Sequence, residues 1–288
     1  MLQAMQSSPE LFISLVVILG LLVGSFLNVV IYRLPIMMER DWKAQYDELN
    51  GNESESSTLA FTLSKPRSRC PHCEHQIGAL ENIPVVSYLV LGGKCKQCKA
   101  SISMRYPIIE AFTGLLSGII AWYFGYDWAC LGALLLTWSL IALSFIDIDH
   151  QLLPDSITLP LVWLGISFNI FTHYTDLQSS VIGAMAGYLS LWLVFHAFKL
   201  VTGKEGMGYG DFKLLAALGA WLGWALLPSI ILLSSLVGAV VGISLIIFRR
   251  HQRDIPIPFG PYLAAAGWLA LVWGTDINNA YLSWVLGS

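Results

Sequence analysis

The sequence of 288 residues contains few charged side chains. Asp, Glu, Lys and Arg make up 12% of it, and the mean hydropathy is +0.64. A soluble domain of this length carries about 25% charged residues. The shortage excludes an ordinary soluble protein and indicates a membrane protein. The net charge of −3 says little by itself, and we expect no nucleic-acid partner.

The first ten residues contain no Lys or Arg. A cleavable signal peptide begins with a positively charged segment, so we expect none at this end. The first apolar run, residues 11–32, is long enough at about 1.5 Å per residue to cross a hydrocarbon core of about 30 Å. We also find no internal repeat of 20–50 residues, and we interpret the first run as a transmembrane helix.

Further apolar runs predict an all-α polytopic protein with about eight transmembrane helices. The sixth and seventh runs are divided near Pro228. A single re-entrant element in their place is the alternative, and it would change the parity of the number of crossings. The eight runs are residues 11–32, 107–124, 128–146, 156–172, 179–201, 212–226, 227–248 and 262–284.

The basic residues predict the orientation. Ten of the 16 Lys and Arg residues lie between Arg33 and Arg105, three lie in 199–213 and three in 249–253. With eight crossings, all three clusters fall on one side, which the positive-inside rule makes cytoplasmic. Both termini then face outward, and the turn at 147–154 faces the cytoplasm.

We predict three segments along the chain. Residues 1–32 form the first transmembrane helix, residues 33–106 a cytoplasmic loop domain, and residues 107–288 a helical membrane core. The stretch "DELNGNESESSTLAF" within the second segment is polar and acidic, which is typical of a flexible insert.

Four of the five cysteines form two C-x2-C pairs. Cys70 and Cys73 are separated by 21 residues from Cys95 and Cys98. Two such pairs place four thiolates around one tetrahedral metal ion, usually a structural zinc. The alternatives are disulfides, which a reducing cytoplasm disfavours, and unligated thiols. His72 and His75 are weaker candidate ligands, and Cys130 is interpreted as a small core residue.

The stretch "FIDIDHQLLPDSI" places three carboxylates at the end of an apolar run. Asp147 and Asp149 are two residues apart, so on a helix their side chains diverge by about 200° and at most one faces a given partner. For both, a solvated helix end remains the alternative. For Asp155 we prefer the role of helix N-cap.

A fourth carboxylate, Asp211, follows "GMGYG" and precedes an apolar run. Gly208 and Gly210 leave room for an extended peptide beside the carboxylate, although a helix N-cap is the alternative for Asp211. A side chain at Gly210 is then expected to block a peptide more than it disturbs folding. The stretch is not a nucleotide-binding loop, because Glu205 stands where Ser or Thr follows the Lys.

Asp147 and Asp211 both fall at cytoplasmic ends of membrane segments, where ionisable residues are candidates for function. Two neighbouring carboxylates share a proton, so one activates water while the other polarises a carbonyl. This is aspartic peptidase chemistry. A proton-coupled transporter that uses both aspartates as a relay, and a zinc-bearing scaffold, are the competing functions. Glu110 is a weaker candidate for lining the site.

Together these motifs resemble the type IV prepilin peptidase family, the integral-membrane aspartic peptidases of bacteria that carry a Gly-x-Gly-Asp motif. The resemblance covers essentially the whole chain. It rests on "GSFLNVVIYRLP", the paired C-x2-C motifs, "ENIPVVSYLVLGGKC", "RYPIIE", "DIDHQLLPD" and "GYGD".

The resemblance implies cleavage of basic leaders from prepilins and from pseudopilins of type II secretion, at the cytoplasmic face of the inner membrane. It assigns catalysis to Asp147 and Asp211. It also implies N-methylation of the new N-terminus with S-adenosylmethionine, although the residues themselves show no recognisable cofactor loop.

Overall fold

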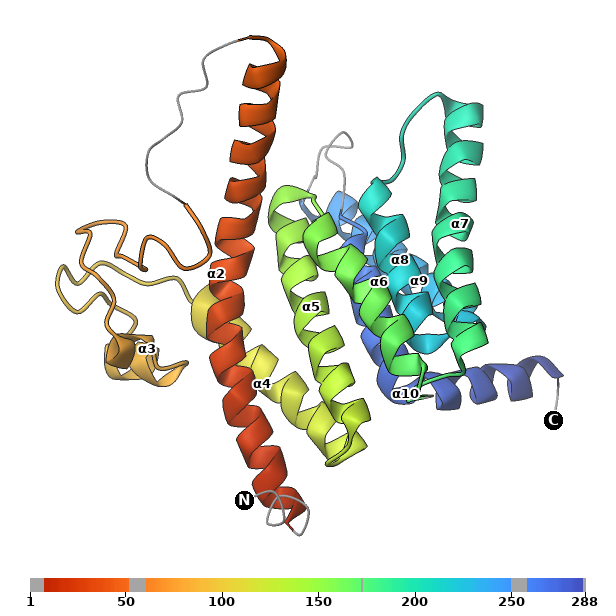
Figure 1. Ribbon diagram of the computed structural model, residues 1–288, viewed down its shortest axis with the longest axis horizontal. Coiled ribbons are helices and arrows are strands. Elements are labelled where there is room, and N and C mark those ends of the chain that lie inside the picture. Colours follow the sequence, from red (N-terminus) through yellow and green to blue (C-terminus); the bar gives the residue numbers. More distant parts are fainter. Residues whose placement is uncertain (1–7, 52–60, 172, 250–257, 287–288) are drawn as a thin grey trace. The chain divides into compact units, whose positions relative to one another are not determined.

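The computed structural model describes every residue except 1–7, 52–60, 172, 250–257 and 287–288. The described residues are helical, with no strand among them (Figure 1). Two short 3-10 helices, η1 and η2, interrupt the α-helices. The helices are α2 (Pro9–Leu49), η1 (Ala79–Asn82), α3 (Val86–Val90), α4 (Arg105–Phe124), α5 (Trp128–His150), α6 (Asp155–Asn169), α7 (Leu177–Thr202), α8 (Tyr209–Leu222), η2 (Trp224–Leu226), α9 (Leu227–Arg249) and α10 (Gly260–Leu286).

The chain divides into two compact units, Met1–Tyr126 and Asp127–Ser288. In the first unit, α2 and α4 pack against each other in opposite directions. Asn28 donates to the carbonyl oxygen of Tyr106, while a Cβ added at Gly20 would collide with Ser117. Small residues let transmembrane helices approach closely without a hydrophobic driving force between them.

Helix α2 is longer than the apolar run predicts. It begins at Pro9 but continues past Tyr32 and through Pro35 to Leu49. Residues 36–49 are rich in Met, Glu, Lys, Ala and Leu, which favour helix, so the helix does not stop where the hydrophobicity does. The rest of the predicted flexible insert, residues 52–60, lies outside the described residues. The three-segment division of the chain stays a prediction.

The second unit is built around α8. All its residues from Asp211 to Leu222 except Lys213 are buried, and α7 and α6 pack against it. Gly183 and Gly219 bring the backbones of α7 and α8 into direct contact, so that a Cβ on either would collide with the carbonyl group of the other. Trp221 in α8 donates its indole N–H to the carbonyl oxygen of Leu161 in α6 at 2.8 Å.

The C-terminal end of α8 is fixed by polar contacts. Asn169 donates to the carbonyl oxygens of Ala220 and Trp221 at 2.9 and 3.0 Å, and its own side-chain oxygen accepts from the N–H of Tyr174. Ser180 also donates to Ala220. These bonds satisfy carbonyl groups that a helix end leaves unpaired. They also fix α8 along its axis.

Helices α8 and α9 are separate. Gly223, with φ of 82°, ends α8, and the three residues of η2 lead into α9. The sixth and seventh runs therefore form two helices, with the break a few residues before Pro228. The described residues contain eight helices of 14 residues or more, which correspond one to one with the eight predicted runs.

Five helical segments in the described part of the chain are long and apolar enough to cross a membrane: Pro9–Leu49, Arg105–Phe124, Trp128–His150, Leu177–Thr202 and Trp224–Ser244. Helices α6 and α8 have only 15 and 14 residues. The all-α membrane architecture is thus confirmed, whereas the count of eight spans stays a prediction.

Candidate active site

Asp147 lies near the C-terminal end of α5. Its side chain is 6% exposed, and its Oδ2 accepts a hydrogen bond from the backbone N–H of Gly260 at 3.0 Å. Gly260 is the first residue of α10, so the carboxylate meets the positive end of that helix. A Cβ at Gly260 would lie 2.6 Å from the same oxygen. The position therefore requires a glycine for the carboxylate to keep this hydrogen bond.

Asp211 lies in the first turn of α8 and is also 6% exposed. It is not the N-cap, because Gly208 occupies that position. Its carboxyl turns back toward the start of the helix, since a Cβ added at Gly208 would lie 3.7 Å from Asp211 Oδ2. The structure therefore buries both acids of the predicted pair within the second unit, and their joint role stays a prediction.

Leu153 packs against the chain beside both Asp147 and Asp211. It lies in the turn between α5 and α6, and it contacts the chain beside both acids. A Cβ at Gly210 would lie 2.7 Å from that of Leu153, and one at Gly260 would lie 3.2 Å from its Cδ2. Gly210 therefore faces a packed leucine, whereas a Cβ at Gly208 would meet nothing closer than 3.7 Å.

The other two acids of the α5–α6 turn lie elsewhere. Asp149 is exposed while Asp147 is buried, which confirms that their side chains diverge. The N-cap role predicted for Asp155 is wrong, because Pro154 is the N-cap of α6. Instead, Asp155 accepts from the Lys213 ammonium group at 2.6 and 2.7 Å. Lys213 is 58 residues away, so local sequence could not reveal this ion pair.

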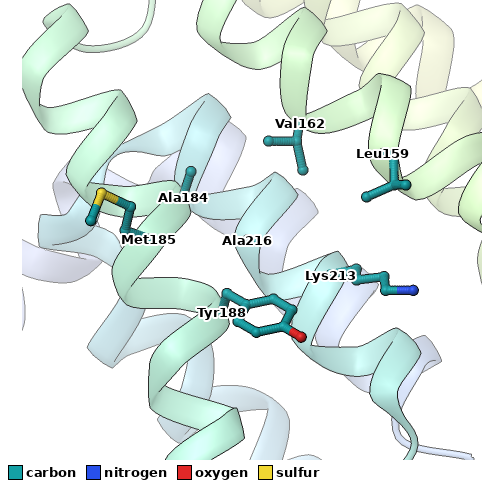
Figure 2. Close-up of a pocket in the computed structure, with 7 residues that line it drawn as sticks. All are labelled: Leu159, Val162, Ala184, Met185, Tyr188, Lys213 and Ala216. Atoms are coloured by element: carbon teal, nitrogen blue, oxygen red, sulfur yellow. The ribbon is translucent and has the colours of Figure 1, made fainter.

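A shallow hollow of about 300 Å³ lies between α6, α7 and α8. Figure 2 shows apolar side chains around it, with the Tyr188 ring and the Lys213 stem at one end. Neither Asp147 nor Asp211 lines the hollow. No carboxylate, histidine or cysteine lines it, and the Lys213 ammonium group is paired with Asp155, so we assign no chemistry to it.

Glu110 lies in the first unit, in the second turn of α4. Its side chain is buried, and Oε2 accepts a hydrogen bond from the N–H of Val85 at 2.7 Å. Val85 has φ of 61°, a left-handed conformation that β-branched residues rarely adopt. The contact fixes the start of α3 beside α4. A role for Glu110 in lining the site stays a prediction.

The four predicted cysteines come together in the first unit. Their sulfur atoms all lie within 4.8 Å of one another, with Cys70 and Cys98 3.8 Å apart and Cys73 and Cys95 4.0 Å apart. Metal–sulfur bonds of about 2.3 Å at tetrahedral angles place sulfurs about 3.8 Å apart. The cluster therefore fits one tetrahedral metal ion.

The two C-x2-C loops have matching backbones. Cys70 N–H donates to His75 O at 2.9 Å, and Cys95 N–H donates to Ala100 O at 2.8 Å. In each loop the residue after the second cysteine, Glu74 or Lys99, has positive φ. Backbone N–H groups point at the sulfurs, and hydrogen bonds from His72 and Cys73 lower the pKa of Cys70 to about 7. Backbone hydrogen bonds also lower the pKa of Cys95, so these two thiols are prepared to act as thiolate ligands.

The two histidines beside the cysteines are not part of this cluster. His75 Nε2 lies 3.0 Å from Glu81 Oε2, and His72 is exposed. Neither belongs to the group of metal-ligating atoms found in the described residues. Four cysteines therefore suffice for the site, as the sequence indicates.

Comparisons with known proteins cover nearly the whole chain. Residues 18–124 match the model of the bacterial peptidase A24 N-terminal domain, and residues 134–243 match the model of the type IV leader peptidase family. Three similar proteins each bear the name prepilin leader peptidase/N-methyltransferase. The relative from Stutzerimonas stutzeri is 59% identical (96% of each chain), that from Pseudomonas aeruginosa 57% (98% of this chain, 97% of the relative), and that from Aeromonas salmonicida 56% (99% of each). No solved structure matches this chain.

Proposed function

This chain belongs to the type IV leader peptidase family, so it is a peptidase that also carries methyltransferase activity, and we propose that Asp147 and Asp211 form its peptidase site. One observation carries the proposal: two carboxyls from different helices are both buried, and the same residue, Leu153, contacts the chain beside each of them. Burying an acid is energetically costly, so buried acids in a membrane protein are candidates for function. The substrates follow from the relatives' names and are prepilins.

The chemistry needs one protonated and one ionised carboxyl. The ionised carboxyl takes a proton from water, and the resulting hydroxyl adds to the scissile carbonyl carbon. The protonated partner donates its proton to the carbonyl oxygen. Collapse of the tetrahedral diol breaks the C–N bond. The leaving amine takes a proton from the carboxyl that had deprotonated the water, and one diol hydroxyl gives its proton to the other carboxylate, which restores the starting pair. The N–H of Gly260 orients Asp147 throughout.

The substrate reaches this pair from the membrane. As the family resemblance implies, a prepilin leader is basic and precedes an apolar helix, and pseudopilins of type II secretion share this form. That helix lies in the bilayer, so the scissile bond comes to the cytoplasmic face of the inner membrane. The peptide must be extended there, because a helical peptide bond is shielded by its own hydrogen bonds. Gly208 borders open space beside Asp211, so it is the better candidate for this approach.

The four-cysteine cluster holds a structural zinc ion. Four protein ligands leave no position for water or substrate, so the ion supplies folding stability rather than catalysis. S-adenosylmethionine is the methyl donor that the family resemblance implies, and no residue is assigned to it. A proton-relay transporter is not favoured, because a relay is expected near the bilayer midplane, whereas both acids lie at helix ends.

Mass spectrometry of a prepilin incubated with the purified protein, with and without S-adenosylmethionine, tests both activities. We expect loss of the leader in both samples and a gain of one methyl group only when the donor is present. An intact prepilin would contradict the peptidase function. A cleaved but unmethylated product would contradict the methyltransferase function alone.

A second prediction concerns Gly260. Replacing it by alanine puts a methyl group 2.6 Å from Asp147 Oδ2, so the carboxyl must move and lose its hydrogen bond. Misplacement of a catalytic group by about 1 Å costs roughly 100-fold in rate. We therefore expect kcat for cleavage to fall about 100-fold, with little change in KM.

Gly267→Ala is the matched control for this substitution. It lies on the same helix, and its new methyl group would collide with the side chain of Leu218 rather than with an acid. It should lower thermal stability without a selective loss of kcat. Equal kinetic losses in the two variants would mean that Gly260 matters only for packing.

A third prediction revises the expectation for Gly210. The added side chain of Gly210→Val would collide with buried Leu153, so this variant should lose stability as well as activity. Overpacking of this kind costs about 1–3 kcal/mol. Gly208→Ala has room and should melt at the wild-type temperature. Thermal melting in detergent, with cleavage rates measured in parallel, checks both variants. A Gly210→Val protein that melts like the wild type would restore the original expectation.

A further inference from the structure

A cluster of apolar side chains is exposed on the short helices of the first unit. Leu89 is 71% exposed and Val90 79% exposed, although both belong to a folded helix. Contiguous exposed apolar residues mark an interaction surface, whereas isolated ones need no explanation. The members of the cluster are Leu80, Ile83, Val86, Leu89 and Val90, and we call them the η1–α3 apolar surface.

This surface has a defined direction. Val86, Leu89 and Val90 are spaced i, i+3 and i+4, so they share one side of α3. The opposite side is held by Tyr88, whose hydroxyl donates to Ile102 O at 3.4 Å and whose ring packs against Gly93. The apolar side chains therefore cannot turn inward without breaking these contacts.

The depth of α3 is set by Glu110. The N–H of Val85, the residue that precedes α3, is bonded to Glu110 Oε2. Glu110 is five residues beyond Arg105, where α4 begins, which is about 7.5 Å along a membrane-spanning helix. Ile108 in the same part of α4 is 54% exposed. Figure 1 likewise shows α3 beside the α2–α4 pair and not beside the C-terminal half of α2.

The charges around this surface are predominantly positive, although Lys96 pairs with Glu81 Oε1 at 3.3 Å. Residues 62–105 contain seven Lys and Arg and only two acids, Glu74 and Glu81. Lys94, Lys96 and Lys99 follow α3 closely in the chain, and all three are exposed. Each basic residue near an anionic leaflet contributes about 1 kcal/mol of attraction. The surface therefore combines exposed apolar side chains with nearby cations, which is the pattern of an interfacial membrane anchor.

We propose that the η1–α3 apolar surface lies in the interface of the anionic leaflet, with its side chains at the boundary between headgroups and acyl chains. The lipid is the occupant because α2 and α4, on either side of this segment in the chain, cross the same bilayer. The metal-binding loops are thereby attached to the membrane surface at a third point. This inference does not depend on the peptidase function.

Photo-crosslinking in the full chain tests the proposal. Leu89 is replaced by p-benzoylphenylalanine, and the protein is reconstituted in nanodiscs of phosphatidylethanolamine and phosphatidylglycerol. We expect phospholipid adducts, detected by mass spectrometry, at a yield similar to that of the same probe at Ile108. Gln97, which is exposed on the second cysteine loop, is the matched control and should give at least 10-fold fewer adducts.

Two outcomes would overturn the proposal. One is the absence of lipid adducts at Leu89 while Ile108 gives them. The other is a crosslink from Leu89 to added prepilin in place of lipid, which would make the surface a substrate contact. Nanodiscs of phosphatidylcholine alone should lower the yield at Leu89 but not at Ile108. An unchanged yield at Leu89 would show that attraction between the basic residues and anionic lipid does not contribute to this contact.

Discussion

Replacing Asp147 or Asp211 by asparagine should abolish leader cleavage, with kcat lowered by about 10³-fold or more in each variant. Asparagine keeps the size of the side chain but cannot accept or donate the proton in the reaction, and acid–base groups contribute 10²–10⁴-fold each. Because the two carboxyls act as one unit, the double variant should be hardly worse than either single variant. Cleavage of a purified prepilin, followed over time, measures the effect.

Asp149→Asn is the control for this pair. It lies two residues from Asp147 and is exposed, so it should retain most of the activity. Binding of prepilin and the melting temperature should be close to wild type in all three variants, which separates chemistry from folding. An inactive Asp149→Asn together with an active Asp147→Asn would reverse the assignment. Near-normal cleavage by Asp211→Asn would remove that residue from the pair.

Metal removal should have the second large effect. Elemental analysis is expected to give one zinc per chain, and Cys70→Ser or Cys95→Ser should lose it. Structural zinc sites contribute on the order of 10 kcal/mol to folding of their own domain. Hydrogen exchange should therefore rise sharply over residues 66–105, while α5 to α10 keep their protection.

Cys130→Ser is the matched control for metal loss. Cys130 is buried in α5, and it is not part of the four-sulfur cluster. This variant should keep its zinc. A chain that contains no metal yet keeps residues 66–105 resistant to protease would show that these loops fold without an ion.

Features that depend on neighbouring residues could be predicted from the sequence. The apolar runs predict the eight long helices because a membrane span needs a continuous stretch of apolar residues. The cysteine cluster could be predicted because the two sulfurs of each C-x2-C loop are only three residues apart. The loop itself brings them together, independently of the rest of the chain. The divergence of Asp147 and Asp149 followed from helical geometry alone.

Features that depend on distant parts of the chain could not be predicted. The hydrogen bond to Asp147 comes from the backbone of Gly260, which lies 113 residues away and carries no side chain to signal a role. The residue type and position of Asp155 predict a helix cap, and local sequence does not reveal that the lysine it pairs with belongs to another helix. The break at Gly223 did have a local signal, since glycine commonly ends helices in a left-handed conformation.

The overlong first helix has a different cause. Hydrophobicity indicates where a helix leaves the bilayer, and it does not indicate where the helix ends. Past Tyr32 the chain keeps strong helix formers, and Arg33 is buried, donating to the carbonyl oxygens of Thr62 and Pro66 at 2.9 and 2.7 Å. Helix α2 therefore continues to Leu49, while the chain at residues 62–66 is held against the middle of this helix by Arg33.

The short length of α8 has a consequence for the substrate. Fourteen residues rise about 21 Å, whereas the hydrocarbon core is about 30 Å thick. Since Asn169 and Ser180 hold one end of α8, the shortfall falls at the end that carries Asp211. Because α8 is buried among α6, α7 and α10, this shortfall is covered by protein and not by lipid. If Asp211 acts as proposed, the scissile segment of the substrate must therefore enter the helix bundle to reach it.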